Sequence, residues 1–169
     1  DTPGIFADTE LSLIQTLIKE YRQKANWIII CYHGGEEYTF CPSPAKRSKL
    51  KRFIDMGADI VVSNHSHTIQ GYEYYQDGII FYSLGNFIFD TSNQRIHEGT
   101  DQSVIINLRM SKENFSYNSI FSKIDRLTGN INISRSNPYF RSISNKTYRM
   151  QWNFDCFRLF KNRCDPNIN

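Results

Sequence analysis

The sequence predicts an α/β (α+β) domain in which parallel strands are followed by antiparallel hairpins. Helical patterns alternate with short apolar runs over residues 10–63, as in sheets whose parallel strands are joined by helices. Short β-prone runs with turn signals between them then follow over residues 69–134, which favours antiparallel pairing. The 169 residues are 40% hydrophobic and 14% aromatic, enough for one domain with a buried core.

Two amphipathic helices are expected. The first runs over residues 10–24, with Asp8 or Thr9 at its N-cap. Its apolar side chains recur at helical spacing and form one stripe: Leu11, Ile14, Leu17, Ile18 and Tyr21. The second runs over residues 44–56 and contains the densest basic stretch, Lys46–Arg52. We interpret this stretch as a solvated helix face; the alternative is attraction to an anionic polymer or a membrane surface.

Two apolar runs predict parallel strands. Residues 26–32 and 59–63 have few polar side chains, which is typical of strands buried on both faces. Cys31 lies in the first run and is interpreted as a small core side chain. The sequence leaves open whether Cys156 and Cys164 form a disulfide.

The second half of the chain has the patterns of antiparallel strands. An Asp77-Gly78 turn joins residues 69–75 to residues 79–84 in a hairpin. The strands expected after it are residues 103–110, 115–123 and 130–134. Beyond Ser136 the pattern fades, and the aromatic residues between 152 and 160 indicate a short packed helix or cap.

Histidines gather where the two parallel strands are expected to end. His33 follows the first apolar run, and His65 and His67 follow the second. On an extended backbone, residues i and i+2 project from one face with attachment points roughly 6.5 Å apart. The carboxyl ends of such strands are where open α/β sheets bind ligands, and imidazole is a common ligand for zinc and similar ions. The pattern therefore predicts a metal or phosphoryl site, the alternative being polar loop histidines that face water.

Several motifs in order along the chain carry a family resemblance. They are His33-Gly34-Gly35-Glu36-Glu37-Tyr38, the segment Ile54–Val62, the segment Asn64–Gly71 and the segment Tyr82–Phe87. Together they resemble the carboxyl-terminal half of the bacterial capsule-synthesis CapA family, also called poly-γ-glutamate capsule (PGA_cap) proteins, in the calcineurin-like metallophosphoesterase superfamily. The resemblance covers about residues 25–90. It implies a four-layer metallophosphoesterase-like sandwich, with residues 1–135 as the carboxyl-terminal part of that domain and 136–169 as an extension or cap.

The resemblance also implies roles for individual residues. His33, His65 and His67 would be metal ligands, and the cofactors would be divalent ions such as Zn, Mn or Fe, at a two-metal site in the full-length domain. Glu37 would orient a ligand histidine. Asn64 stands where the family has a histidine, and it would donate a hydrogen bond to a phosphoryl oxygen. His33, Glu37 and Asn64 are thus the candidate catalytic residues.

Some of the superfamily's motifs have no counterpart in this sequence. The first metal motifs, which supply an aspartate, an acidic or amide ligand and an Asn-His pair, are not found between Asp1 and Lys24. The chain also starts without methionine. We therefore expect it to be a piece of a longer bacterial protein, located at the membrane or cell surface if an amino-terminal anchor precedes it.

Three hypotheses for function follow. The first is a CapA-like, metal-dependent hydrolase of capsule or poly-γ-glutamate biosynthesis that acts on an anionic polymer or a phosphoester, with a membrane-bound capsule synthase as partner. The second is a non-catalytic assembly or polymer-binding homologue that kept the fold but lost a complete metal site. The third is metal-free hydrolysis through Ser83, although Tyr82-Ser83-Leu84-Gly85 lacks a nucleophile elbow and is better interpreted as packing at the end of a sheet. The net charge of +3 is too small to favour nucleic acid as a partner.

Overall fold

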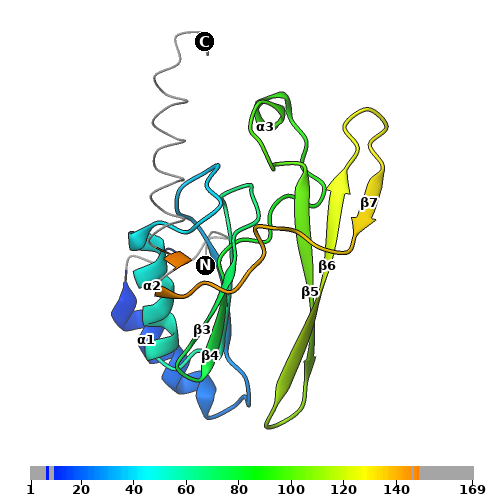
Figure 1. The fold of residues 1–169 in the computed structure, drawn as a ribbon. Helices are drawn as coiled ribbons and strands as arrows, with labels where there is room; N and C mark the ends of the chain where they lie inside the picture. The colour runs from blue at the N-terminus through cyan, green and yellow to red at the C-terminus, as the bar shows by residue number, and fades with distance from the viewer. Residues whose placement is uncertain (1–6, 8–9, 146, 149–169) are drawn as a thin grey trace, which may run out of the picture.

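Two β-sheets and three helices make up the part of the chain that a computed structural model describes, which is residue 7, residues 10–145 and residues 147–148 (Figure 1). In chain order the elements are α1 (Leu11–Arg22), β1 (Ile29–His33), α2 (Pro44–Asp55), β2 (Ile60–Asn64), β3 (Tyr72–Tyr75), β4 (Gly78–Phe81), α3 (Ser92–Arg95), β5 (Gln102–Met110), β6 (Phe115–Ile124) and β7 (Ile131–Ser134).

The sheet topology confirms the predicted mixed class. The first sheet has the strand order β1-β2-β4-β3, in which β1, β2 and β4 run parallel and β3 pairs antiparallel with β4. The second sheet, β5-β6-β7, is antiparallel throughout. Helices α1 and α2 lie on one side of the first sheet and the second sheet lies on its other side (Figure 1). The described residues thus show three of the four layers that the resemblance implies.

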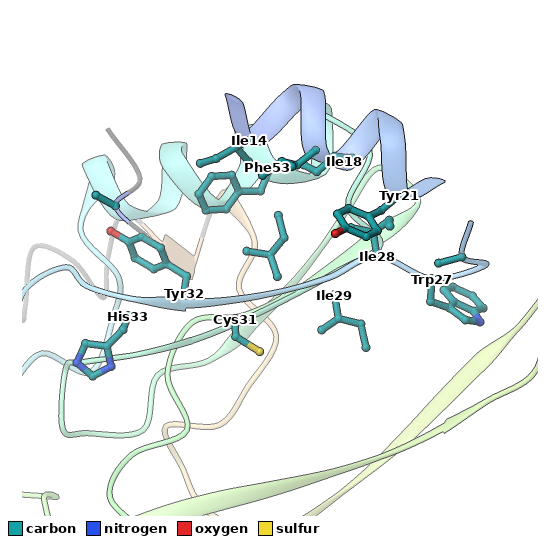
Figure 2. Close-up of a pocket in the computed structure, with 14 residues that line it drawn as sticks. Ile14, Ile18, Tyr21, Trp27, Ile28, Ile29, Cys31, Tyr32, His33 and Phe53 are labelled. Atoms are coloured by element: carbon teal, nitrogen blue, oxygen red, sulfur yellow. The ribbon is translucent and has the colours of Figure 1, made fainter. Parts of the chain in front are cut away.

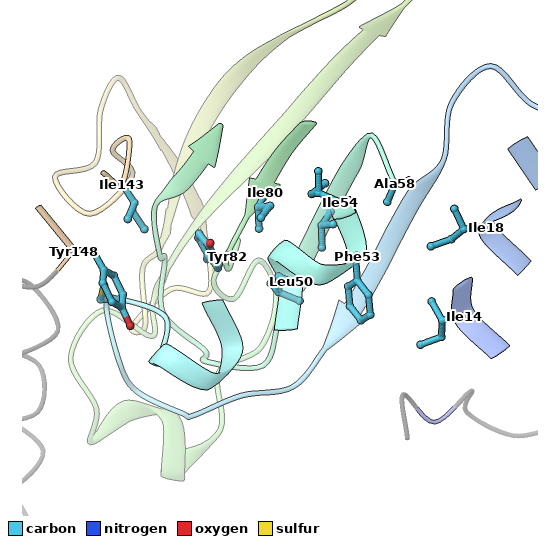
Figure 3. Close-up of a cluster of buried hydrophobic side chains, with 12 residues drawn as sticks. Ile14, Ile18, Leu50, Phe53, Ile54, Ala58, Ile80, Tyr82, Ile143 and Tyr148 are labelled. Carbon is cyan, nitrogen blue, oxygen red and sulfur yellow. The ribbon is translucent and has the colours of Figure 1, made fainter. Parts of the chain in front are cut away.

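Each face of the first sheet packs in its own core. Neighbouring residues of a strand point to opposite faces, so on β2 Val61 meets the helices and Ile60 meets the second sheet. Figure 3 shows the helix-side core, in which Phe53 of α2 and Ile18 of α1 lie over the sheet. Burial on both faces is typical of a central parallel strand such as β2, and it fixes where the carboxyl end of β2 lies.

Helix α2 differs from the solvated basic face that the sequence predicted. Ser43 caps it by accepting a hydrogen bond from the Lys46 backbone N–H at 3.1 Å. Arg47 and Lys51 approach the Glu73 carboxylate of β3 at 2.6 and 2.8 Å, and Lys46 is only 3% exposed. The expectation was wrong for Arg47 and Lys51, which pair with the buried Glu73 carboxylate, and for Lys46, which meets Gln70. It holds for Arg52, which is exposed.

Strand β1 also differs from its prediction. Cys31 is exposed, because β1 forms the edge of the sheet and its side chains alternate between exposed and half-buried positions. The interpretation of Cys31 as a core side chain was therefore wrong. Cys156 and Cys164 lie outside the described residues.

The α1 prediction is confirmed in its extent and only partly in its details. Ile14 and Ile18 of the stripe are buried, whereas Tyr21 is 53% exposed. The N-cap position is Glu10, which makes no capping hydrogen bond through its side chain. The predicted caps, residues 8 and 9, lie outside the described residues.

After β7 the chain returns to the first sheet. The backbone N–H of Tyr72 donates to Arg141 O, and the N–H of Ile143 donates to Tyr72 O. Ile143 and Tyr148 are buried in the helix-side core. A domain boundary at residue 135 stays a prediction, and the helix or cap expected near residues 152–160 lies outside the described residues. Among the described helices, none has the length and apolar character that crossing a membrane requires.

Candidate metal centre

The candidate site lies where β1 and β2 end. These strands are in register, with His33 beside Asn64, so the residues that follow each strand meet at one edge of the sheet. The expectation that His65 and His67 stand on extended backbone was wrong. Strand β2 ends at Asn64, and His65 and His67 have φ angles of 109° and 58°. Non-glycine residues in this left-handed region are uncommon and gather at functional sites.

This turn brings four predicted side chains together. Ligand atoms of Glu37, His65 and His67 all lie within 4.8 Å of one another, and Glu37 Oε1 is 3.6 Å from His67 Nε2. His33 lies outside that trio, but its Nε2 is 3.2 Å from His65 Nδ1. The resemblance implied that Glu37 orients a ligand histidine. In the structure, a Glu37 carboxylate oxygen lies among the potential ligand atoms themselves.

The charge state of His65 suits a ligand. Burial lowers the pKa of His65 below its ordinary value, and the neighbouring His33 lowers it further. A neutral imidazole keeps a lone pair on one nitrogen, which metal coordination requires. His65 is therefore in its ligand form at neutral pH.

Asn86 fixes the tautomer of His67, and sequence reasoning missed this role. The Asn86 amide nitrogen donates to the backbone oxygen of Thr100 at 3.0 Å and to Gln94 Oε1 at 3.3 Å. Its Oδ1 must then be the acceptor in the 2.9 Å contact with His67 Nδ1. In the neutral His67 ring the proton is therefore on Nδ1, which leaves Nε2, 3.6 Å from Glu37 Oε1, as the ligand atom. Asn86 lies inside the quoted family segment, but nothing in the sequence pairs it with His67.

A buried polar network joins the two loops that carry these ligands. The Tyr38 backbone N–H donates to Ser66 O at 2.7 Å. Gln70 Nε2 donates to Thr39 O at 3.1 Å and to Thr39 Oγ1 at 2.9 Å, and the Thr68 hydroxyl also donates to Thr39 O. Because these polar groups are buried and paired, moving either loop would break several hydrogen bonds at once.

Lys46 approaches the same network from α2. Its Nζ lies 3.4 Å from Gln70 Oε1, and its side chain fills the space that a Cβ on Gly35 would need. Gly35 has a φ of 107°, so this turn needs glycine for both its conformation and its packing. Burial lowers the pKa of Lys46 to about 8.

Asn64 and Ser83, the other residues that the hypotheses named, make hydrogen bonds to backbone N–H groups. Asn64 accepts a hydrogen bond from the Leu84 backbone N–H at 3.0 Å through Oδ1, so a phosphoryl contact would fall to its Nδ2. Ser83 is 1% exposed, and its Oγ accepts from the Gly85 N–H. Burial of Ser83 supports packing at the end of the sheet over attack on a substrate.

Aromatic side chains line one side of the site. Tyr38 stacks on His97 with ring centroids 3.6 Å apart, and Phe89 stacks on His67 at 5.3 Å. His97, the chain's fourth histidine, lies beside the cluster without belonging to it.

The donor set fits a divalent transition metal. Imidazole nitrogens together with one carboxylate oxygen suit zinc, manganese or iron. The 3.2 Å between His33 Nε2 and His65 Nδ1 is close to the about 3.3 Å expected between two nitrogens on one tetrahedral zinc ion. The described residues contain one such cluster, which would hold one ion.

Fold and site together define a mixed α/β protein with a histidine-carboxylate cluster at the carboxyl ends of parallel strands, consistent with a metallophosphoesterase-like fold. Residues 2–91 match the family model described as "Bacterial capsule synthesis protein PGA_cap". This match spans more than half of the chain, which therefore belongs to that family.

Known relatives agree with this assignment. The chain is 48% identical over 66 residues to "Capsule biosynthesis protein CapA" of Bacillus anthracis, covering 39% of this chain and 16% of that protein. It is 34% identical over 113 residues to "PGA biosynthesis protein CapA" of Bacillus subtilis, covering 66% of this chain and 28% of that protein. An uncharacterised protein of Sinorhizobium fredii, y4sH, is 32% identical over 83 residues, which is 48% of this chain and 18% of y4sH. The chain thus spans less than a third of each relative.

Proposed function

We propose that this chain carries the carboxyl-terminal half of a metal-dependent hydrolase site that acts in capsule or poly-γ-glutamate biosynthesis. The observation that supports this most is the convergence of Glu37, His65 and His67 within 4.8 Å, beside His33. The substrate would be an anionic polymer or a phosphoester, as the names of the relatives and the resemblance to metallophosphoesterases suggest. A membrane-bound capsule synthase is the proposed partner.

The chain's own residues would divide the work at this site. His33, His65, His67 and Glu37 would hold the ion, which when bound supplies Lewis-acid chemistry toward a phosphoryl or acyl group. Asn86 would hold the proton of the neutral His67 ring on Nδ1, which leaves Nε2 as the ligand atom. Asn64 Nδ2 would bind a substrate oxygen, and Phe89 with Tyr38 would exclude water from one side.

Metal content of matched histidine variants tests this proposal. The purified chain, dialysed against trace zinc and manganese, is expected to retain about one ion, because its cluster offers ligands for one. His65→Ala and His67→Ala should each lose it. His97→Ala is the matched control, since it removes a nearby imidazole outside the cluster and should keep the ion. Equal metal content in all four proteins, by elemental analysis, would contradict the assignment.

A non-catalytic binding role is the second candidate. One observation favours it: the described residues contain one cluster of potential metal ligands, which would hold one ion of a two-metal site. In this case the chain would bind polymer without cleaving it. Hydrolysis of bis-p-nitrophenyl phosphate by the metal-loaded protein, lost in His67→Ala and kept in His97→Ala, would decide for the hydrolase. Metal binding without any such hydrolysis would favour the binding role.

A further inference from the structure

An exposed apolar loop follows β4 at the border of the candidate metal centre. Two of its residues contact the ring of His67: Asn86 Oδ1 lies 2.9 Å from Nδ1, and the Phe89 ring stacks with centroids 5.3 Å apart. Phe87 and Ile88 lie between these two in the chain and are 45% and 77% exposed. Neighbouring exposed apolar side chains mark interaction sites, whereas single scattered ones do not.

Ile96, which follows α3, adds to this surface from the other end of the same loop. It is 72% exposed, and the next residue, His97, stacks on Tyr38. Tyr38 stacks in turn on His67, so Ile96 adjoins the aromatic side chains that line the site. The apolar rim is defined as Phe87, Ile88, Phe89 and Ile96.

Ion pairs hold the apolar rim in place. The Asp90 carboxylate, which follows Phe89, pairs with Arg95 at 2.7 Å and with Arg126 of the β6–β7 turn at 3.3 Å. Arg126 also donates to Arg95 O at 3.1 Å and to Thr100 Oγ1 at 2.7 Å. The loop is therefore fixed before a ligand arrives, which lowers the ordering cost of binding.

The chemistry of the apolar rim suits a hydrocarbon. Its side chains carry no charge and no hydrogen-bonding group, and Arg95, which precedes Ile96, is paired with Asp90. A chain of carboxylates would lose hydration on this surface without gaining polar partners. A hydrocarbon chain needs apolar contact alone, and each methylene that it buries strengthens binding about fourfold.

We propose that the apolar rim binds the hydrocarbon chain of a lipid phosphate whose phosphoryl group lies at the candidate metal centre. This inference rests on the proposed function and narrows its substrate class to phosphoesters of long-chain alcohols. Hydrolysis of such a phosphomonoester forms a P–O bond to the oxygen of water and breaks the P–O bond to the lipid. A proton from that water passes to the released alcohol, and inorganic phosphate is the second product.

A second apolar surface also reaches the site. A groove of about 620 Å³ lies between α1 and β1, with His33 at one end and Ile29 further along the strand (Figure 2). The apolar rim is the better candidate for the hydrocarbon chain, because Phe89 stacks directly on His67. His33 lies outside the trio of ligand atoms to which His67 belongs. Ile29, which is 41% exposed, offers a variant that distinguishes the two surfaces.

Binding of two alkyl phosphates tests the proposal. The zinc-loaded 169-residue chain is titrated by calorimetry with methyl phosphate and with octyl phosphate, the latter below its micelle concentration. Octyl phosphate is expected to bind roughly tenfold more tightly or better, a gain that requires about two fully buried methylenes. Ile88→Ser and Ile96→Ser should each lose most of this gain and keep the affinity for methyl phosphate. Ile133→Ser, at a 66% exposed position on β7, is the matched control and should keep both.

Four results would overturn the proposal. Equal affinity for the two phosphates would remove the lipid phosphate and leave the proposed function standing, because methyl phosphate needs the ion alone. Failure of both phosphates to bind would count against the proposed function as well. A gain that is lost in Ile29→Ser and kept in Ile88→Ser would assign the hydrocarbon chain to the groove between α1 and β1. Binding to phosphatidylcholine vesicles without any phosphomonoester, lost in Ile88→Ser, would assign the apolar rim to a membrane surface.

Discussion

Replacing Asn86 with leucine removes the side chain that hydrogen-bonds His67 Nδ1. The variant loses the acceptor for His67 Nδ1–H and the donors to Thr100 O and Gln94 Oε1. Because Asn86 is only 7% exposed, water cannot fully replace these bonds. Leaving such buried groups unpaired should lower the free energy of unfolding by about 1–3 kcal/mol.

The effect on the metal should be separable from the effect on stability. Partners that orient a ligand histidine are typically worth about 10–100-fold in metal affinity, or about 1.4–2.7 kcal/mol. Titration of folded Asn86→Leu with zinc is expected to show that loss. Nitrogen chemical shifts should show the His67 proton on Nδ1 in the wild type and a mixture of tautomers in the variant.

Ser103→Ala is the control for Asn86→Leu. It breaks a buried 2.6 Å hydrogen bond to Ser122 between β5 and β6, so it should destabilise the protein by about 1 kcal/mol without changing zinc affinity. The reasoning is refuted if Asn86→Leu keeps the wild-type tautomer and binds zinc within threefold of the wild type.

Three further predictions concern stability. Burial acts to raise the pKa of Glu73, but hydrogen bonds from Arg47, Lys51 and Tyr82 outweigh it and lower that pKa below 4.5. The ionised Glu73 carboxylate should therefore stabilise the fold fully above pH 4.5, and this contribution should be lost as the pH falls through the lowered pKa. Urea unfolding of Glu73→Gln should lack that acid dependence. Burial lowers the pKa of Lys46 from 10.5 to about 8, so between pH 8 and 10.5 the unfolded chain binds more protons than the folded one. The free energy of unfolding should therefore rise from pH 8 to 10.5 in the wild type but not in Lys46→Met. Phe81 is fully buried between the sheets, so Phe81→Ala should cost about 3–5 kcal/mol in urea unfolding, whereas Ile133→Ala at a 66% exposed position should change it by less than about 0.5 kcal/mol.

Periodicity predicted the elements well where burial is regular. Apart from the short helix α3, which lies in a stretch that the sequence predicted to be a loop, the helix and strand positions agree with the expected ranges within a few residues. They agree because α2 packs Leu50 and Phe53 at helical spacing and β2 is buried on both faces. The prediction for Cys31 failed because an apolar run looks the same in a central strand and in an edge strand. Likewise, local sequence did not reveal that Glu73, on another strand, would draw Arg47 and Lys51 inward.

The candidate site was predictable in its membership and less so in its geometry. Histidines after two parallel strands had to meet at one sheet edge, which placed His33, His65 and His67 together. The left-handed backbone of His65 and His67 was not predictable, because periodicity says nothing about a chain after its strand has ended. The Asn86 contact depends on a loop that folds back over 19 residues, and no spacing rule reports such a contact.

The open β1 edge has a consequence for handling the protein. Residues 27–32, Trp-Ile-Ile-Ile-Cys-Tyr, combine high β-propensity with no charge and no proline, which is the signature of segments that stack into fibrils. A chain purified without a strand over this edge is therefore expected to aggregate in a concentration-dependent way. Cys31→Pro at this edge strand would act as a gatekeeper, so it should slow the aggregation of the isolated protein.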